Sequence, residues 1–365
     1  MKKIFIVAGE VSGDRIAGWY LAKRLAVEPC DIEGIGGNVA VAAGMRLYER
    51  FESLNVVGIV ELIRHVPRLL KKMHVLAAYI IASGIDEVVL IDFPGFNLRL
   101  ARILKKQKPS LRITYVSPPQ LWAWGAWRLK SLKRFIDDVV VMYPFEVAWY
   151  AERGLTVRWL GSPVAEHLAP YTTAVVAKKP VIALLPASRL SELETMLPLF
   201  LAVVSRLHTM HPMLSFVIPV PQSLTIDDYL RIARAHKRLS VCDVIHFITD
   251  DHEKYVALQS ACVALAKPGT VTLELALLRV PTVVAFKTSW ISYSLARLLV
   301  QIDQMSLPNL LTKKQLCTEL LQKACTVDNM VREVDALAHQ YLYAPEQYVT
   351  ILQGFDVLAD VLCHR

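Results

Sequence analysis

One carboxylate stands at a position suited to chemistry. Asp92 ends the apolar run DEVVLID (86–92) and is followed by Phe-Pro-Gly-Phe-Asn. The last residue of such a buried strand lies at the start of a turn, whose backbone conformation proline and glycine constrain here. A carboxylate at such an edge is placed to act as a general base. A helix-capping aspartate has the same local pattern, so both interpretations stay open at this point.

A glycine-rich turn follows the first apolar run, KIFIVAG (3–9), directly before a helical segment. Its residues with chemical potential are Gly9, Glu10, Ser12, Gly13 and Asp14. Backbone N–H groups at a helix N-terminus, with a carboxylate and a hydroxyl nearby, can hold anions and sugars. Serine and aspartate are also the preferred N-cap residues, so a plain capping turn is the alternative.

The segment YVSPPQLWAWGAWRLK (115–130) contains three tryptophans within six residues. Trp122 and Trp124, with Arg128 and Lys130 nearby, combine aromatic faces with positive charge. These features suit a sugar ring, a phosphate or an interfacial lipid. Packing in the domain core is the commoner use of tryptophan and is the alternative.

Two strand-to-helix turns in the second half carry further candidates. LLPASRLSE (184–192) places Ser188, Arg189 and Glu192 in the first turn of a helix, where a diphosphate can be held. The next turn, KPGT, places Gly269 and Thr270 at a helix start with Glu274 one turn further on. A carboxylate there can accept hydrogen bonds from both hydroxyls of a ribose.

Short β-rich apolar runs alternate with helix-length segments twice along the chain. The pattern predicts an α/β protein with two doubly wound, Rossmann-like domains that face each other across a cleft. No G-x-G-x-x-G fingerprint supports a dehydrogenase. The expected strands are 3–9, 86–92, 112–117, 137–143 and 157–161, and then 180–186, 214–220, 239–247, 261–266 and 280–286.

The same pattern predicts the domain boundaries. We expect an N-terminal domain over 1–170 and a C-terminal domain over 178–345. The loop-like stretch 167–180 is the expected linker. Residues 346–365 are expected to form a helix that packs on the N-terminal domain or on a partner chain.

Positive charge is concentrated in one segment. The 365 residues carry a net charge of +8, and ten basic residues occur between Asp92 and Asp137 without an acidic one. The rest of the chain is therefore close to neutral. Such a segment predicts a surface for phosphates or anionic lipid, with solvated helix faces as the alternative. We expect no nucleic-acid partner.

The sequence predicts a protein that does not cross a membrane and that contains an amphipathic helix with a basic face. The longest uncharged stretch contains prolines and histidines, and the apolar run after Lys3 is too short for a signal peptide, which predicts a cytoplasmic protein. Residues 59–73 combine an apolar stripe with a basic arc, typical of a helix in an anionic interface. A core-packed helix has the same pattern. The stripe is Ile59, Leu62, Ile63, Val66, Leu69, Leu70 and Met73, and the arc is Arg64, Arg68, Lys71 and Lys72.

Eight blocks of sequence, in order, resemble the bacterial lipid-A-disaccharide synthase family over nearly the whole chain. They are AGEVSGD (8–14), VVGIVEL (56–62), IDFPGFN (91–97), YVSPPQLWAW (115–124), YPFE (143–146), LPASRLSE (185–192), GTVTLE (269–274), and SLPNLL (306–311) with ELLQ (319–322). The resemblance implies a GT-B-type fold and an inverting glycosyl transfer. It also implies that the N-terminal domain (1–170) is acceptor-binding and membrane-facing and that the C-terminal domain (178–345) binds the UDP-sugar. The implied donor is UDP-2,3-diacylglucosamine and the acceptor is 2,3-diacylglucosamine 1-phosphate (lipid X). The implied products are the β-1,6-linked lipid A disaccharide 1-phosphate and UDP.

The resemblance also implies roles for individual residues. Asp92 matches the family's catalytic base, and Glu10 and Ser12 are further catalytic candidates. The implied substrate-binding residues are Gly9, Gly13, Asp14, Asn97, Trp122, Trp124, Ser188, Arg189, Glu192, Gly269, Thr270, Glu274, Asn309 and Gln322. Gly95, Ala187 and Pro268 depart from the family pattern, which has Asp, Gly and Ser there.

The expected partners are the two lipid-linked substrates, an anionic membrane surface at the inner face of the cytoplasmic membrane, and a second copy of the chain. Neither a cofactor nor a metal is expected, because the sequence contains no Asp-x-Asp or His-rich cluster. Two other classes stay open. A different sugar-nucleotide enzyme, such as an epimerase or the peptidoglycan glucosaminyl transferase, would share the sheets but not the WAW and SLPNLL blocks. A two-lobed binding protein would carry an export signal and would give Asp92 no task.

Overall fold

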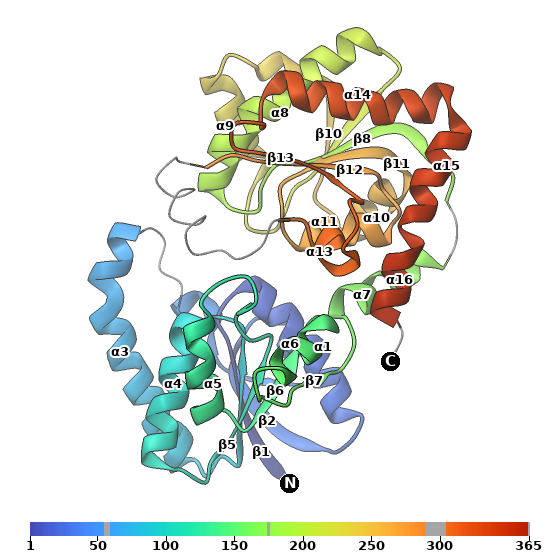
Figure 1. Ribbon diagram of the computed structural model, residues 1–365. Coiled ribbons are helices and arrows are strands. Elements are labelled where there is room, and N and C mark those ends of the chain that lie inside the picture. The colour runs from blue at the N-terminus through green and yellow to red at the C-terminus, as the bar shows by residue number, and fades with distance from the viewer. Residues whose placement is uncertain (55–58, 174–175, 289–303, 364–365) are drawn as a thin grey trace. The chain divides into compact units, whose positions relative to one another are not determined.

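The computed structural model describes residues 1–54, 59–173, 176–288 and 304–363 (Figure 1). Within them the chain divides into two compact units, Met1–Pro163 and Val164–Arg365. Each unit is considered by itself below. Residues 56–58 of the block VVGIVEL lie outside the described residues, and residues 59–62 belong to a helix of which only the backbone is described.

Parallel strands form the centre of the first unit. Its described residues contain a seven-stranded sheet in the order β3-β2-β1-β4-β5-β6-β7. The strands are β1 (Lys2–Ala8), β2 (Cys30–Gly36), β3 (Arg46–Arg50), β4 (Glu87–Ile91), β5 (Arg112–Val116), β6 (Asp138–Val141) and β7 (Arg158–Trp159). The helices are α1 (Val11–Leu25), α2 (Asn38–Ala42), α3 (Ile59–Ala82), α4 (Pro94–Gln107), α5 (Leu129–Phe135) and α6 (Phe145–Ala151), with one-turn 3₁₀ helices at Phe51–Leu54 and Ala126–Arg128.

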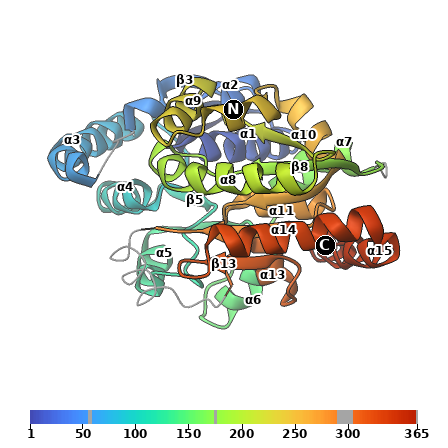
Figure 2. The ribbon, with the colours of Figure 1, turned by 90° about the horizontal axis from the view of Figure 1, so that it is seen from above.

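Helices cover both faces of this sheet. Side chains alternate between the faces of a strand, and Phe5 and Val7 of β1 share one core with Leu76 of α3 and Leu100 of α4. Figures 1 and 2 both show α3 beside α4, and α5 packs on α4. Helix α1 contacts β1, β2 and β4 and pairs with α2. The first unit is therefore doubly wound, as predicted.

The second unit repeats the architecture. Within the described residues its sheet has six parallel strands in the order β10-β9-β8-β11-β12-β13. The strands are β8 (Lys179–Leu185), β9 (Ser215–Pro219), β10 (Ile245–Ile248), β11 (Ala261–Ala266), β12 (Thr282–Phe286) and β13 (Thr318–Leu321). The helices are α7 (Pro163–Thr172), α8 (Leu190–Met210), α9 (Ile226–Ala235), α10 (Asp251–Ser260), α11 (Thr270–Leu277), α13 (Leu307–Thr312), α14 (Val327–Tyr343), α15 (Pro345–Gly354) and α16 (Asp356–Cys363), with a 3₁₀ helix at Leu239–Val244.

Two cores show how helices enclose this sheet. Helices α8, α9 and α14 pack against one face, where Ile182 and Leu184 of β8 join Phe200 of α8. Helices α10 and α11 pack on the other face, where Ala183 of β8 joins Tyr255 of α10. The predicted pair of doubly wound α/β units with parallel sheets is thus confirmed.

Some elements differ from the sequence prediction. All ten expected strands contain strand residues, although 239–247 becomes a strand only at Ile245. The described residues add β2, β3 and β13, which the apolar pattern did not predict because they are short, exposed or rich in glycine and charge. Residues 167–172 of the expected linker lie in α7, whose Leu168 is buried in the α10–α11 core. The contact boundary accordingly falls after Pro163.

The C-terminal segment forms two helices instead of one. Leu358 and Leu362 of α16 are buried, and α16 contacts α11 and α13 of the same unit. Its packing on the N-terminal domain or on a partner chain stays a prediction. Among the helices of the described residues, none is both long and apolar enough to cross a bilayer.

A half-buried lysine, Lys178, lies at the amino edge of the second sheet. Lys178 Nζ donates to the carbonyl oxygens of Gln259 (2.9 Å) and Leu278 (3.2 Å), where α10 and α11 end. Burial, more than the nearby charge of Arg279, lowers the pKa of Lys178 to about 8. Because unfolding returns this pKa to its ordinary value near 10.5, the unfolded chain binds the proton more tightly than the folded one.

We predict that wild type gains stability relative to Lys178→Met as pH rises from 8 to 10.5, by at most about 3 kcal/mol. The contribution is fully present above the unfolded pKa and is lost as pH falls through the folded one. Urea unfolding of both proteins across this range measures the difference. Lys179→Met, which alters the exposed neighbour, should follow the wild-type pH dependence, and a pH-independent difference for Lys178→Met would contradict the prediction.

Candidate active site

The loops after β1 and β4 meet at one edge of the first sheet. The two strands are neighbours and pair in register as far as Ala8 and Ile91, so that Gly9 and Asp92 begin adjacent loops. From here β1 leads to β2 on one side and β4 leads to β5 on the other. This edge is therefore the topological switch point, where open α/β sheets bind their ligands.

The turn that carries Asp92 is strained and firmly held. Asp92 and Phe93 have positive φ angles, 48° and 46°, a conformation that costs non-glycine residues about 1–3 kcal/mol each. The buried Asn97 donates from Nδ2 to the carbonyl oxygens of Asp92 (2.8 Å) and Ile91 (3.1 Å). The Tyr115 hydroxyl donates to the same Asp92 carbonyl (2.6 Å). Asp92 is thus presented at the switch point by a backbone that two elements hold in place.

Two neighbours adapt to this turn. An added Cβ at Gly9 would lie 2.5 Å from the Phe93 ring, so glycine allows the first loop to pack on the Asp92 turn. Burial, followed by the charge of Asp92, raises the pKa of Tyr115 well above its usual value, so the hydroxyl stays a donor. Tyr115 was not predicted as a site residue, because a tyrosine near the end of an apolar strand is typical of a core position.

Strand pairing brings the other catalytic candidates to the same edge. Glu10 is the N-cap residue of α1 and is half-buried, and Ser12 lies exposed in the first turn. The side chain of Glu10 makes no capping hydrogen bond to this helix. Carboxylates are stabilised near a helix N-terminus by its partial positive charge. Glu10, Ser12 and Asp92 therefore lie on adjacent loops, while Gly13 is buried against Ala8.

Asp14 has a structural task. It is buried and accepts hydrogen bonds from the backbone N–H groups of Gly37 (2.7 Å), Val39 (3.0 Å) and Ala40 (3.1 Å) at the start of α2. A helix start leaves such donors without partners in the helix itself. These contacts account for the Asp14 carboxylate, and its role in substrate binding stays a prediction.

The tryptophan-rich segment is tied to the turn between β6 and α6. Trp122 is buried and donates from Nε1 to Glu146 Oε1 (2.8 Å), while Glu146 Oε2 accepts from two backbone N–H groups of the β6–α6 turn. Burial raises the pKa of Glu146 to about 7. Trp124 lies 4.3 Å from the Arg128 guanidinium, measured to the ring centroid. Trp122 is thus packed in the domain core, the alternative considered from the sequence. Glu146 has a structural role, which its sequence motif did not indicate.

The second unit has an equivalent switch point between β8 and β11. Leu185 pairs with Ala266, and the next residue, Lys267, donates its backbone N–H to the Leu185 carbonyl (2.9 Å). The loops that carry Ser188 and Gly269 therefore start side by side. An ion pair of 2.8 Å between Lys267 Nζ and Glu192 Oε1 joins them.

The two helices that start at this edge have no side-chain cap, as is also the case for α13 and α15 of the same unit. Neither the N-cap residue of α8, Arg189, nor that of α11, Gly269, supplies a capping hydrogen bond from its side chain. In contrast, Thr225, Asp250 and Thr326 cap α9, α10 and α14. N–H groups at such helix starts favour an anion. The exposed candidates gathered here are Ser188, Arg189, Gly269 and Thr270.

Glu274 lies beside this edge in a nearly buried ion pair. Its Oε2 is 3.1 Å from Lys254 Nζ of α10, and the side chains of Lys254 and Glu274 are 16% and 12% exposed. The Lys254 ammonium therefore holds the Glu274 carboxylate in position beside the edge. Lys254 was not predicted, since it precedes Glu274 by twenty residues and belongs to no motif.

Asn309 and Gln322 hold loops together. Asn309 Nδ2 donates to the Cys317 carbonyl and to Glu319 (both 2.9 Å), and Oδ1 accepts from two backbone N–H groups between α13 and β13 (2.7 and 2.8 Å). With its amide turned so that both atoms are satisfied, Gln322 pairs with the backbone N–H and C=O of Thr288 (3.2 and 3.1 Å). The full hydrogen-bonding capacity of Asn309 is therefore used internally, and substrate contacts by both residues stay predictions.

Within the described parts of the chain, no group of three or more His, Cys, Asp and Glu side chains is arranged to hold a metal ion. The expectation that neither a metal nor a cofactor takes part stays a prediction.

Comparison with known sequences decides the family. Residues 4–348 match the family model of lipid-A-disaccharide synthetase. The lipid-A-disaccharide synthase of Anaeromyxobacter dehalogenans is 35% identical over 92% of this chain and 88% of that protein. The Alkalilimnicola ehrlichii protein of the same name is 34% identical over 97% and 96%. The chain belongs to the lipid-A-disaccharide synthase family.

Solved structures agree on the fold of this family member. It resembles the S. aureus MnaA–UDP co-structure (TM-score 0.63, 14% identity, 97% of this chain and 91% of that one). It also resembles MurG of Acinetobacter baumannii (TM-score 0.56, 13% identity, 99% of both chains). The predicted family, the GT-B-type fold and the predicted function as a glycosyltransferase, a lipid-A-disaccharide synthase, are confirmed.

Asp14 offers a test of its structural task in this synthase. We predict that Asp14→Ala lowers the free energy of unfolding by about 2–3 kcal/mol, because three backbone N–H groups, two of them buried, lose a charged acceptor. Urea unfolding measures the loss, and the KM for both substrates should stay at the wild-type value in the folded fraction. A large rise in KM with unchanged stability would instead place Asp14 at the substrate.

Proposed function

We propose that this lipid-A-disaccharide synthase binds its acceptor at the Asp92 edge of the first unit and its UDP-sugar donor at the β8–β11 edge of the second. The donor is UDP-2,3-diacylglucosamine and the acceptor is lipid X. The observation that carries the assignment is the strained Asp92 turn at the switch point, held by Asn97 and Tyr115. Strain of this kind is retained where a side chain must be presented in one position.

The proposed reaction is a single displacement with inversion. Asp92 accepts the proton of the acceptor 6-hydroxyl while that oxygen forms a bond to the anomeric carbon of the donor. The bond from this carbon to the diphosphate oxygen breaks, and UDP leaves with the bonding electrons. General-base assistance of this kind contributes about 10²–10⁴ in rate. Glu10 and Ser12, on the adjacent loop, are proposed to orient the reacting hydroxyl.

The donor edge is proposed to stabilise the leaving group. Negative charge develops on the diphosphate as the glycosidic bond breaks. The N-termini of α8 and α11, with Arg189 and the hydroxyls of Ser188 and Thr270, supply donors in fixed positions. Glu274 is proposed to accept the ribose hydroxyls.

The remaining candidates are given supporting or lining roles. Gly9 and Gly13 allow the loop to pack closely, and Asn97 fixes the Asp92 turn. Trp124, next to Arg128, is proposed to face the acceptor sugar or its phosphate. Trp122, Asn309 and Gln322 are proposed to act by holding the loops of the two edges.

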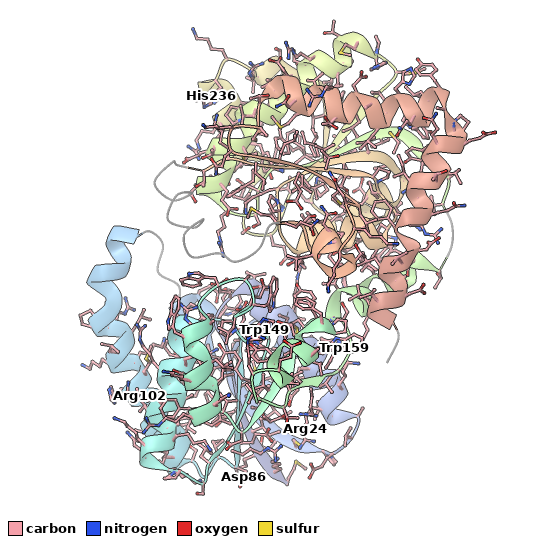
Figure 3. The ribbon with its side chains drawn as sticks, viewed as in Figure 1. Arg24, Asp86, Arg102, Trp149, Trp159 and His236 are labelled. Atoms are coloured by element: carbon pink, nitrogen blue, oxygen red, sulfur yellow. The ribbon has the colours of Figure 1, made fainter. Side chains whose placement is uncertain are left out.

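We propose that the first unit lies on the inner face of the cytoplasmic membrane, because both substrates carry acyl chains. Helices α3, α4 and α5 lie side by side, and α4 and α5 contain no acidic residue. The basic residues exposed on them are Arg68, Lys71, Arg99, Arg102 on α4 (Figure 3), Lys106, Lys130, Lys133 and Arg134. Leu70 and Val75 of α3 are exposed apolar residues, whereas Met73 of the predicted stripe is buried.

Not all ten basic residues of the acid-free segment belong to this basic helical face. Lys105 and Arg112 pair with Asp137 and Glu87 at the opposite, amino edge of the sheet, about 20 Å away along the length of α4. The domain roles predicted from the sequence and the homodimer are retained as proposals.

Replacing the proposed base tests the reaction. We predict that Asp92→Asn lowers kcat by about 10²–10⁴-fold, because the amide cannot take the proton. Disaccharide formation from UDP-2,3-diacylglucosamine and lipid X measures the rate. UDP affinity should be unchanged, since the donor is assigned to the other unit. A variant as fast as wild type would remove Asp92 from this role.

Removing exposed charge tests the membrane surface. We predict that Arg68→Gln/Lys71→Gln weakens binding to vesicles containing anionic lipid by about 25-fold at low salt, since each basic residue near such a surface contributes about 1 kcal/mol. Vesicle co-sedimentation measures the affinity. The matched control Arg231→Gln/Arg234→Gln removes the same charge from α9 of the second unit and should bind as wild type does. Equal loss in both variants would assign the effect to net charge alone.

A further inference from the structure

Lys267 is the first residue of the KPGT turn, and the sequence motifs assign no role to it. It directly follows β11, and its backbone N–H continues the pairing with β8 by donating to Leu185 (2.9 Å). Its side chain therefore emerges between the loops that begin α8 and α11. These are the loops to which the proposed function assigns the diphosphate of the donor.

The ammonium group is enclosed from two sides. Lys267 Nζ lies 2.8 Å from Glu192 Oε1 on the first turn of α8 and 5.3 Å from the centroid of the Phe286 ring at the end of β12. The side chains of Lys267 and Glu192 are only 18% and 23% exposed. A cation in such surroundings is screened less by salt than a surface lysine.

The pair leaves Glu192 incompletely satisfied. Its Oε2 is buried and makes no hydrogen bond with any described residue. A carboxylate repels a diphosphate, so Glu192 itself is a poor phosphate ligand. Lysine has the opposite charge and three rotatable donors, which suit phosphate oxygens. The partial positive charge of the α8 N-terminus attracts the Glu192 carboxylate whether or not the lysine is present.

We propose that Lys267 binds the diphosphate of the nucleotide donor and that Glu192 is the counter-ion that holds its ammonium group at the β8–β11 edge. The proposal rests on the proposed donor class, a nucleoside diphosphate sugar. It changes the part played by Glu192, which the sequence placed among the substrate ligands, and it adds a positive charge at the leaving group.

Calorimetric titration of the full chain with UDP and with uridine, at low ionic strength, tests the proposal. Lys267→Met should weaken UDP binding by about tenfold and leave uridine binding unchanged, because uridine lacks the diphosphate. Lys267→Arg should restore most of the UDP affinity. The matched control Lys179→Met lies at the other end of β8 and should bind UDP as wild type does.

Glu192→Gln distinguishes a Lys267 that binds phosphate from a Lys267 that only ties the two loops together. It removes a like charge and releases Lys267, so UDP binding should become about threefold tighter. If Glu192→Gln weakens UDP binding as much as Lys267→Met, the pair only holds the loops together and the proposal is wrong. It is also wrong if Lys267→Met binds UDP within twofold of wild type, or loses uridine equally.

The same titrations distinguish this inference from the proposed function. If wild type binds UDP and only the Lys267 prediction fails, the donor assignment stands and the inference alone is overturned. If wild type binds neither UDP nor the UDP-sugar, the proposed function fails with it. Thermal unfolding of each variant checks that the compared proteins are folded, and Lys267→Gln replaces Lys267→Met if the latter is not.

Discussion

The parallel pairing of β1 with β4 and of β8 with β11 is the constraint on which the site depends. Each pair joins two strands whose onward connections run in opposite directions across the sheet. The helices that follow therefore cover opposite faces, and the two loops at the carboxyl edge have no helix between them. Ala8 and Ile91, or Leu185 and Ala266, end side by side because their strands are in register. Strand register thus makes neighbours of residues that are far apart in sequence.

Stability and function make different demands at these two edges. In the second unit, Thr225 and Asp250 cap helices that start elsewhere, while α8 and α11 start at the switch point without a side-chain cap. In the first unit, the strain at Asp92 is offset by Asn97 and Tyr115, which satisfy the carbonyl of the strained residue. The backbone strain at Asp92 is thus offset by residues of α4 and β5 that lie behind the turn.

The order of strands and helices could be predicted from the sequence more completely than the contacts between side chains. Buried parallel strands such as β4 and β11 are continuous apolar runs, so their existence and carboxyl ends could be predicted. The exposed β3 and the short β13 carry no such run and were missed. Partners such as Lys254 for Glu274 could not be predicted, because the contact is made by strand order and helix packing. Motif spacing also gave no indication that Asp14 would cap α2.

Family motifs in this chain mark loop geometry as much as ligand contact. Asn309 and Trp122 belong to recognisable blocks, and the polar atoms of both are used within the protein, on Glu319 and Glu146. Glu192 lies in an equally recognisable block, and one of its buried oxygens has no partner among the described residues. A polar atom already satisfied by the fold gains little from a ligand, whereas a buried unsatisfied one gains a full hydrogen bond. The state of each polar atom, which the sequence does not contain, therefore identifies Asn309 and Trp122 as residues that shape the site, whereas Glu192 is engaged on one oxygen only, by Lys267.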